Sequence, residues 1–173
     1  MIIIRVLIIS LLTLVISSCN SDQGRENRKS GPDKKEMADL NKYFVQKDRE
    51  RIESYIVRKN LKMTESPSGL WYAIIKEGTG NYFTDNDKVM LEYEVTLLDG
   101  TSCYSSNEIG PKEVIIGKSG IESGLNQGLR MLKSGGESIF IIPPFLAFGL
   151  TGDGKKIPSR AVIIYNITSA QKN

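Results

Sequence analysis

Cysteine and histidine usage sets the first limit on the chemistry of this chain. The 173 residues contain no histidine and two cysteines, Cys19 and Cys103. Without an imidazole, Ser-His and Cys-His nucleophilic catalysis are excluded, together with the commonest metal ligand. If Cys19 carries a lipid, Cys103 has no partner for a disulfide or for a zinc site of the Cys/His type. We therefore expect a function without a covalent nucleophile, a metal or a cofactor.

The segment that ends at Cys19 has the pattern of a lipoprotein signal peptide, which we assign to residues 1–18. Arg5 precedes an aliphatic run, and this run is shorter than the roughly 20 apolar residues that a membrane-spanning helix needs. It ends in Ile16-Ser17-Ser18-Cys19, which resembles the bacterial lipobox. The alternative is an ordinary secretory signal that ends near a cysteine. The lipobox predicts lipidation of Cys19, attachment to a membrane through that lipid, and a location in the cell envelope facing the periplasm or the cell surface.

Two segments separate the lipobox from the folded domain. Residues 19–33 are polar and charged, which predicts a disordered tether. Residues 34–66 are expected to form an amphipathic helix, over 34–60, and a linker, and the entirely polar run 47–51 predicts weak packing in the middle of that helix. A solvated helix with a local packing role and a helix that dimerises or binds a partner both remain open. The apolar positions of the helix are Met37, Leu40, Phe44, Ile52, Tyr55 and Ile56.

Residues 67–173 have the pattern of a domain of the α+β class. Between 89 and 97 apolar and polar residues alternate as in a half-buried strand, and Asp99-Gly100 provides a hairpin turn. Apolar residues from Ile121 to Leu132 line one face of a short helix that we expect to end at Gly135-Gly136. The expected fold is an antiparallel sheet wrapped around this short helix and preceded by the N-terminal amphipathic helix. The partner strand of the hairpin should start near Thr101, and the remaining expected strands are 70–75, 114–116, 137–142 and 161–168, with a long loop at about 145–160.

Charge and composition narrow the range of partners. The chain is 40% hydrophobic and 25% charged, and its net charge of +3 comes from 23 basic and 20 acidic residues that are well mixed. Because no basic stripe interleaved with aromatic residues is present, we expect no nucleic-acid partner.

An ordered series of motifs carries a resemblance to a known family. Its members are Gly78-Thr79-Gly80, Tyr93 ahead of Asp99-Gly100, Gly117, Ile121, Gly124, Gly128, Leu132, Gly135, Ile142-Pro143-Pro144-Phe145-Leu146-Ala147-Phe148-Gly149 and Ile157-Pro158. The series resembles the FK506-binding-protein (FKBP-type) family of peptidyl-prolyl isomerases. The lipobox, the linker helix and the segment 104–110 resemble more narrowly the lipoprotein branch of that family that is associated with bacterial gliding motility.

The resemblance implies a peptidyl-prolyl cis-trans isomerase that assists the folding of exported, proline-containing polypeptides. This activity agrees with the missing nucleophiles, because rotation about a prolyl bond breaks amide resonance but makes and cuts no covalent bond. The resemblance implies a catalytic role for Tyr93, Phe148 and Tyr165. It further implies a substrate pocket that includes Cys103, Tyr104, Ile121, Leu125 and Ile157.

The chain departs from the family pattern at three of these positions. The family commonly has Phe-Asp-Ser-Ser where this chain has Cys103-Tyr104-Ser105-Ser106, so the pocket acid is absent at this position. Leu125 takes the place of a tryptophan, and Phe148 replaces the more usual tyrosine. A shift of one residue would let Tyr104 act as the aromatic wall, but such a shift turns every side chain of the strand to the other face. The register of 103–106 therefore stays open.

Two alternatives to an isomerase follow from these features. One is a catalytically weak FKBP-like binding or chaperone module with a degenerate pocket. The other is a structural component of an envelope machine, for gliding or secretion, in which the helix at 34–60 contacts a partner.

Overall fold

The computed structural model describes residues 31, 33–118 and 120–173. The predicted signal peptide, Cys19 and almost all of the predicted tether lie outside these residues. Within the described ranges, no helix combines the length and the apolar character needed to cross a membrane. The chain divides into two units, Met1–Asp39 and Leu40–Asn173, and the second unit contains the folded domain.

The predicted N-terminal helix is confirmed as α2, which spans Lys34–Arg58. It begins with a capping box, in which the Glu36 amide donates to Asp33 Oδ1 at 2.8 Å and the Asp33 amide donates to Glu36 Oε2 at 3.1 Å. Two of its side chains are buried, Asp48 and Ile52. The polar run 47–51 therefore does not leave the middle of the helix unpacked, because Asp48 turns inward to an ion pair with Arg160, at 2.9 Å. That expectation was wrong.

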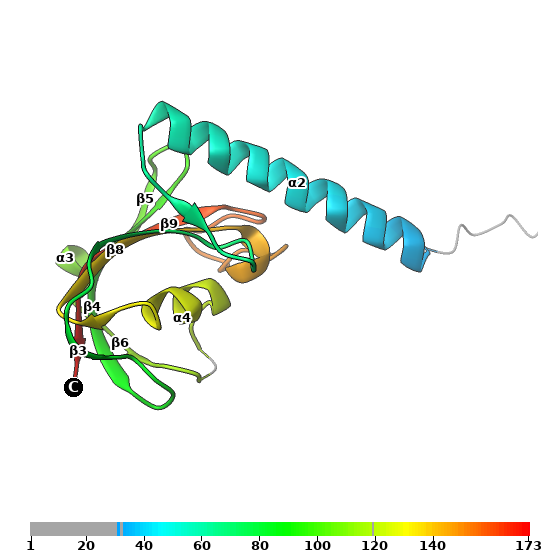
Figure 1. Cartoon of the computed structure of the whole chain (residues 1–173). Coiled ribbons are helices and arrows are strands. Elements are labelled where there is room, and N and C mark those ends of the chain that lie inside the picture. The colour runs from blue at the N-terminus through cyan, green and yellow to red at the C-terminus, as the bar shows by residue number, and fades with distance from the viewer. Residues whose placement is uncertain (1–30, 32, 119) are drawn as a thin grey trace, which may run out of the picture. The chain divides into compact units, whose positions relative to one another are not determined.

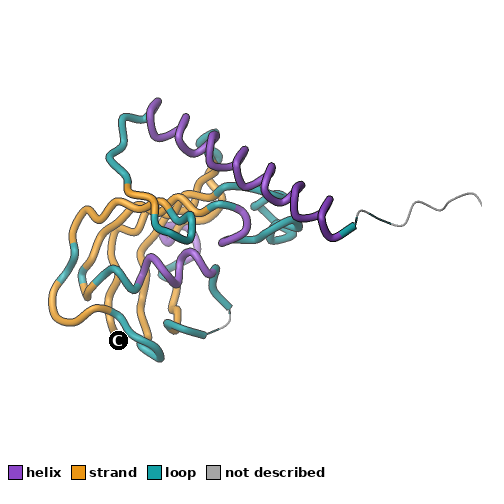
Figure 2. The backbone as a smooth tube through the Cα atoms, turned by 45° about the vertical axis from the view of Figure 1, so that its right-hand side comes forward, coloured by secondary structure: helices purple, strands orange, loops and turns teal. Residues whose placement is uncertain are grey.

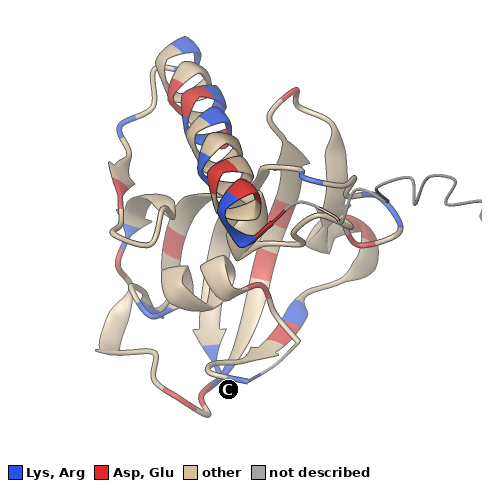
Figure 3. Ribbon diagram, turned by 90° about the vertical axis from the view of Figure 1, so that its right-hand side faces the viewer, with Lys and Arg blue, Asp and Glu red and all other residues tan. Residues whose placement is uncertain are grey.

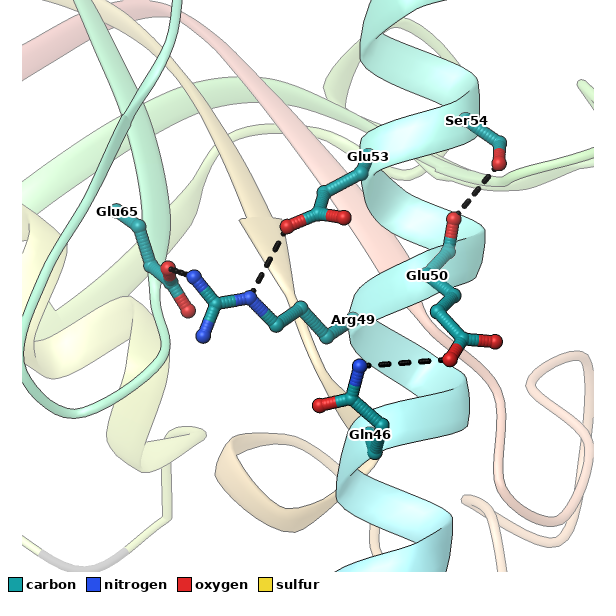
Figure 4. A network of polar contacts seen from close by, with 6 residues as sticks. All are labelled: Gln46, Arg49, Glu50, Glu53, Ser54 and Glu65. Atoms are coloured by element: carbon teal, nitrogen blue, oxygen red, sulfur yellow. Dashed lines mark hydrogen bonds and ion pairs between the residues drawn. The ribbon is translucent and has the colours of Figure 1, made fainter.

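Basic and acidic residues are interspersed along α2 (Figure 3). Arg49 contacts two carboxylates, Glu53 Oε1 at 3.0 Å in the same helix and Glu65 in strand β1 (Thr64–Glu65). Figure 4 shows this network. The Arg49 and Glu53 side chains are about half exposed and that of Glu65 is partly exposed. Because ion pairs at such positions contribute little to stability, the network mainly links α2 to β1.

The described part of the chain holds a seven-stranded antiparallel sheet in the order β1-β2-β8-β9-β4-β5, with β6 paired to β4 (Figure 1). The long strands β4 and β9 pair from Val89 to Leu97 of β4. Alternation along β4 is confirmed, since Leu91, Tyr93 and Val95 are buried. The strand bounds are Trp71–Lys76 (β2), Thr79–Tyr82 (β3), Lys88–Leu97 (β4), Ser102–Ser105 (β5), Lys112–Ile115 (β6), Lys133–Ser134 (β7), Gly136–Ile142 (β8) and Ile163–Lys172 (β9).

The sheet curves around a short helix, α4, at Ser123–Leu129 (Figure 2). Two glycines permit this close approach: a Cβ added at Gly128 would lie 2.7 Å from the Phe140 ring, and one added at Gly124 would lie 2.4 Å from Ile142 Cγ2. The predicted end of the helix at Gly135-Gly136 was wrong. The helix stops at Leu129. Gly135 instead forms the turn from β7 into β8, with a φ of +79°, and Gly136 is the first residue of β8.

Apolar side chains cover both faces of the sheet. The main cluster lies between the sheet and α4 and includes Phe140 and Ile142. Their neighbour Ile141 points to the opposite face, where it packs with Ile52 of α2. Because alternate residues of β8 are buried on opposite faces, the strand reads as a continuous apolar run at 139–142 and not as an alternating one. Two further short helices lie at Ser106–Ile109 (α3) and Pro144–Leu146 (η1).

Candidate functional site

The eight pocket residues predicted from the sequence come together in the main apolar cluster. Their burial divides them into two groups. A floor of nearly inaccessible side chains comprises Tyr93, Cys103, Leu125, Ile157 and Tyr165. A half-buried rim comprises Tyr104, Ile121 and Phe148. The rim side chains are therefore the ones that a bound peptide could contact most directly.

Two tyrosines form the aromatic part of the floor. Tyr93 on β4 and Tyr165 on β9 lie on neighbouring strands, with ring centroids 5.8 Å apart. Tyr165 Oη donates a hydrogen bond to Glu122 Oε1 at 2.9 Å. Burial, followed by the nearby Glu122 charge, raises the pKa of Tyr165 well above its usual value and raises the pKa of Tyr93 as well. Both phenols are therefore neutral at physiological pH.

Glu122 is the main site residue that the sequence analysis missed. It is the N-cap residue of α4, but its side chain caps no backbone amide and is instead buried, with 8% of the residue exposed. The family-type acid is indeed missing from β5, yet a carboxylate reaches the cluster from a different element. The signal available in the sequence was its position directly after Ile121, a predicted pocket residue.

Strand β5 settles the register that the sequence left open. Tyr104 pairs with Val95 and Ser102 pairs with Thr96, so a bulge leaves Cys103 without a cross-strand partner. The bulge lets two consecutive side chains join the same cluster, with Cys103 buried and Tyr104 half-buried. Neither of the two simple registers, straight or shifted, describes this arrangement.

Asp153 organises the loop next to this bulge and was also missed. Its Oδ1 accepts the amides of Lys155 and Ile157, each at 2.8 Å, and its Oδ2 accepts the Tyr104 hydroxyl. Partial burial opposes ionisation, but the hydrogen bonds from Tyr104 and from the two amides outweigh this effect and lower the pKa of Asp153. The ionised side chain thereby fixes both Tyr104 at the rim and Ile157 in the floor.

The rim residue Phe148 follows the η1 turn. The Ser123 hydroxyl donates to the Leu146 carbonyl at 3.2 Å, which links this turn to the start of α4. On the other side of Phe148, the Arg160 amide donates to the Gly149 carbonyl at 3.0 Å. The Arg160 guanidinium pairs with Asp48 and lies 3.7 Å from the centroid of the Phe44 ring. The loop between Phe148 and Arg160 is thus fastened to α2.

The antiparallel sheet that curves around α4 gives this α+β domain an FKBP-like fold. The sequence profile described as FKBP-type peptidyl-prolyl cis-trans isomerase matches residues 80–169. The chain belongs to this family.

Individual relatives agree with this assignment. The chain is 34% identical over 122 residues to the probable FKBP-type peptidyl-prolyl cis-trans isomerase FkpA of Neisseria meningitidis, a match that covers 69% of this chain and 44% of the relative. It is 31% identical over 121 residues to FkpA of Escherichia coli, covering 70% of this chain and 43% of the relative. The matched region is thus less than half the length of either relative.

Solved structures show the same fold. The crystal structure of FkpA from Escherichia coli superposes with a TM-score of 0.61 at 25% identity, covering 83% of this chain and 76% of that one. The crystal structure of AtFKBP13 superposes with a TM-score of 0.59 at 27% identity and covers 65% of this chain and 99% of that one. The first match covers more of this chain than the second.

Proposed function

We propose that this protein catalyses the cis-trans isomerisation of prolyl peptide bonds. The observation that carries the proposal is the gathering of Tyr93, Tyr165 and Phe148 in one apolar cluster. The barrier to rotation is about 18 to 20 kcal/mol because the planar amide is stabilised by resonance. A dry basin favours the twisted amide, whose charge separation is smaller than that of the planar form. Binding in this basin accelerates the reaction without any nucleophile.

The activity is tested in a proline-limited refolding assay with the full-length protein in mild detergent. Phe148→Ala removes a rim side chain and should abolish most of the acceleration. Phe145→Ala is a matched control, because Phe145 is exposed three residues earlier. Tyr93→Phe removes the floor hydroxyl while it keeps the ring. No acceleration by the folded wild-type protein would contradict the proposed activity, and equal activity of the two alanine variants would contradict the assigned pocket.

The proposed place of action is the cell envelope. We propose that residues 1–18 direct export, that Cys19 is lipidated, and that 19–33 hold the domain away from the membrane while it acts on exported polypeptides. The lipobox ending at Cys19 supports this. Metabolic palmitate labelling of wild type and Cys19→Ala is the direct test, and labelling that persists in the variant would refute lipidation at Cys19. Membership of the gliding-motility branch belongs to the same proposal and predicts a gliding defect when the protein is deleted.

A binding or chaperone module is the second candidate. Two observations favour it. The floor side chains are buried, and Tyr104, which stands where the family commonly has an acid, already donates its hydroxyl hydrogen bond to Asp153. This alternative predicts that a prolyl peptide binds, as seen by chemical-shift changes of the rim residues, without faster exchange between its isomers.

A partner contact through the helix is the third candidate. Leu40 and Val45 of α2 are 46% and 44% exposed, although both are apolar. Leu40→Gln with Val45→Gln should weaken an envelope-partner contact while it leaves refolding activity unchanged, and Lys42→Gln on the same helix is the control. If cells that carry the double variant glide and secrete like wild type, this role is refuted.

A further inference from the structure

A groove lies between α2 and the end of the sheet, away from the predicted prolyl pocket. Its volume is about 800 Å³, within the range of ligand-binding clefts, and its lining includes none of the eight predicted pocket residues. All of the lining residues belong to the second unit. One wall is a single face of α2, and the other is formed by the β4–β5 turn and the segment before β9. The α2 wall presents Lys47, Arg51 and Arg58, and the opposite wall includes Leu98, Asp99 and Arg160.

Contacts beneath the groove fix its two walls. Ile52 of α2 is 1% exposed and packs in one apolar cluster with Val162, which lines the opposite wall. The ion pair between Asp48 of α2 and Arg160 joins the same two walls, with the charged atoms 2.9 Å apart. Because Ile52, Val162 and Asp48 are all buried, these contacts belong to the folded core. The groove is therefore present without a ligand.

Arg51 and Arg58 supply the positive charge of the groove that is least neutralised. Both residues are exposed. Arg51 reaches the buried Asp48 only at 3.5 Å, and Asp48 has Arg160 as its closer partner. Arg58 forms no ion pair with any residue that the structure describes. By contrast, Lys47 on the same wall is paired with a neighbouring glutamate at 2.8 Å. Two guanidinium groups thus remain free to bind an anionic ligand.

The spacing of the two arginines indicates how far apart the anionic groups of a ligand should lie. Arg51 and Arg58 are seven residues apart in α2, which corresponds to about 10.5 Å along the helix axis. In a polyproline-II chain, side chains three residues apart point to the same side and lie about 9.3 Å from each other. Two carboxylates at that spacing can each pair with one guanidinium. Leu98 on the opposite wall offers an apolar surface to the residues between them.

The shape and the charge pattern of the groove favour a polypeptide over other anionic partners. Asp99 lies on the wall opposite the arginines, so a uniformly anionic surface such as a lipid bilayer would be repelled there. A flat bilayer also does not follow a concave surface. The predicted tether of this chain, residues 19–33, contains three acidic and three basic residues and so has no net charge to complement the arginines. A segment with separated carboxylates meets neither difficulty.

We propose that this groove binds an acidic segment of a partner polypeptide, with Arg51 and Arg58 each pairing with one carboxylate. The site is separate from the predicted prolyl pocket, and the proposal does not depend on isomerase activity. It gives the second half of α2 a binding role of its own. A protein that carries such a segment would be held beside the domain through this helix.

Fluorescence anisotropy of a labelled synthetic peptide tests the proposal. The peptide carries two aspartates three residues apart, and its analogue has asparagine at both positions. Neither contains proline, so the isomerase site is not probed. Full-length wild type in mild detergent should bind the aspartate peptide about 10-fold more tightly than the analogue, as expected for two partly exposed ion pairs. This preference should shrink as the salt concentration rises, because exposed charges are screened.

Variants of α2 locate the binding. Arg51→Gln with Arg58→Gln should remove most of the preference for aspartate, with little change in the urea midpoint. Lys42→Gln with Arg49→Gln changes the net charge by the same amount at positions that do not line the groove, and it should keep the preference. If the groove variant does not fold, Arg58→Gln alone, at an exposed position, should lower the preference about 3-fold.

Three results would overturn the proposal. Equal affinity of the aspartate peptide for wild type and for the groove variant excludes the assigned groove. Equal affinity of wild type for the two peptides excludes the requirement for an acidic segment. Inorganic phosphate that displaces the labelled peptide as readily as the unlabelled peptide does would show a site for any small anion, such as the phosphate of a lipid headgroup. The refolding assay measures isomerase activity separately, so its failure is distinguishable from each of these results.

Discussion

Replacing Arg160 with alanine should destabilise the protein far more than its surface position suggests. Arg160 Nη2 lies 2.9 Å from Asp48 Oδ2, and Asp48 is 4% exposed. The substitution leaves a buried carboxylate whose remaining partner, Arg51, is 3.5 Å away and mostly exposed. Breaking a buried ion pair by removing one partner costs about 3 to 5 kcal/mol. Because Arg51 can move closer and Arg160 is partly exposed, we expect the lower limit, about 3 kcal/mol.

Urea unfolding followed by the fluorescence of Trp71 measures this loss. Trp71 is the only tryptophan of the chain and packs in the cluster that holds Ile52 of α2. Arg51→Ala is the matched control and should cost less than about 1 kcal/mol, as for an exposed pair. Adding Asp48→Asn to Arg160→Ala should restore part of the loss, because it removes the unpaired charge.

Arg160→Ala should also increase local opening in one part of the second unit, the helix residues 40–58. Amide hydrogens of residues 40–58 should exchange faster in Arg160→Ala than in wild type, since the variant frees the helix from the loop after Phe148. If Arg160→Ala and Arg51→Ala lose the same small amount of stability, Asp48 does not depend on Arg160 and the reasoning is refuted.

Three further perturbations test the packing and the electrostatics of the site. Gly128→Ala should cost about 1 to 3 kcal/mol in urea unfolding, because its Cβ would meet the Phe140 ring at 2.7 Å, and a cost near zero would contradict the close helix approach. The folded pKa of Tyr165 is raised, so its contribution to stability is complete below about pH 10 and is lost as the pH rises further; Tyr165→Phe should show a flatter alkaline titration of stability. The folded pKa of Asp153 is lowered, so its contribution is present above about pH 4 and is lost as the pH falls through the folded value; the stability difference between wild type and Asp153→Asn should shrink in acid, and a constant difference would argue against this role.

Much of the sheet could be predicted because its signals are local. The alternation along β4 and the Asp99-Gly100 turn are properties of neighbouring residues, and the structure contains both. The end of α4 was predicted wrongly because glycine serves two purposes in this chain. Gly135 forms a turn between strands, whereas Gly124 and Gly128 lie inside the helix and allow close packing. Sequence spacing does not distinguish these uses.

The polar residues of the site could not be predicted because their partners are distant in the chain. Asp48 and Arg160 are 112 residues apart, and Glu122 and Tyr165 are 43 residues apart. Asp48, Glu122 and Arg160 each look like an ordinary surface residue until the partner is known. The bulge at Cys103 is also invisible to a period-two pattern, because that pattern assumes an unbroken register.

The buried thiol of Cys103 can report on the opening of the loop that covers it. Its sulfur lies 3.6 Å from the Lys156 carbonyl, under the loop that Asp153 organises, and burial raises its pKa. A protonated and covered thiol reacts slowly with alkylating reagents and with oxidants. Modification must then await an opening of the loop, so the labelling rate of Cys103, compared with that of a free thiol, gives the population of the open state. In an oxidising compartment, the same cover would protect the protein from cross-linking through this sulfur.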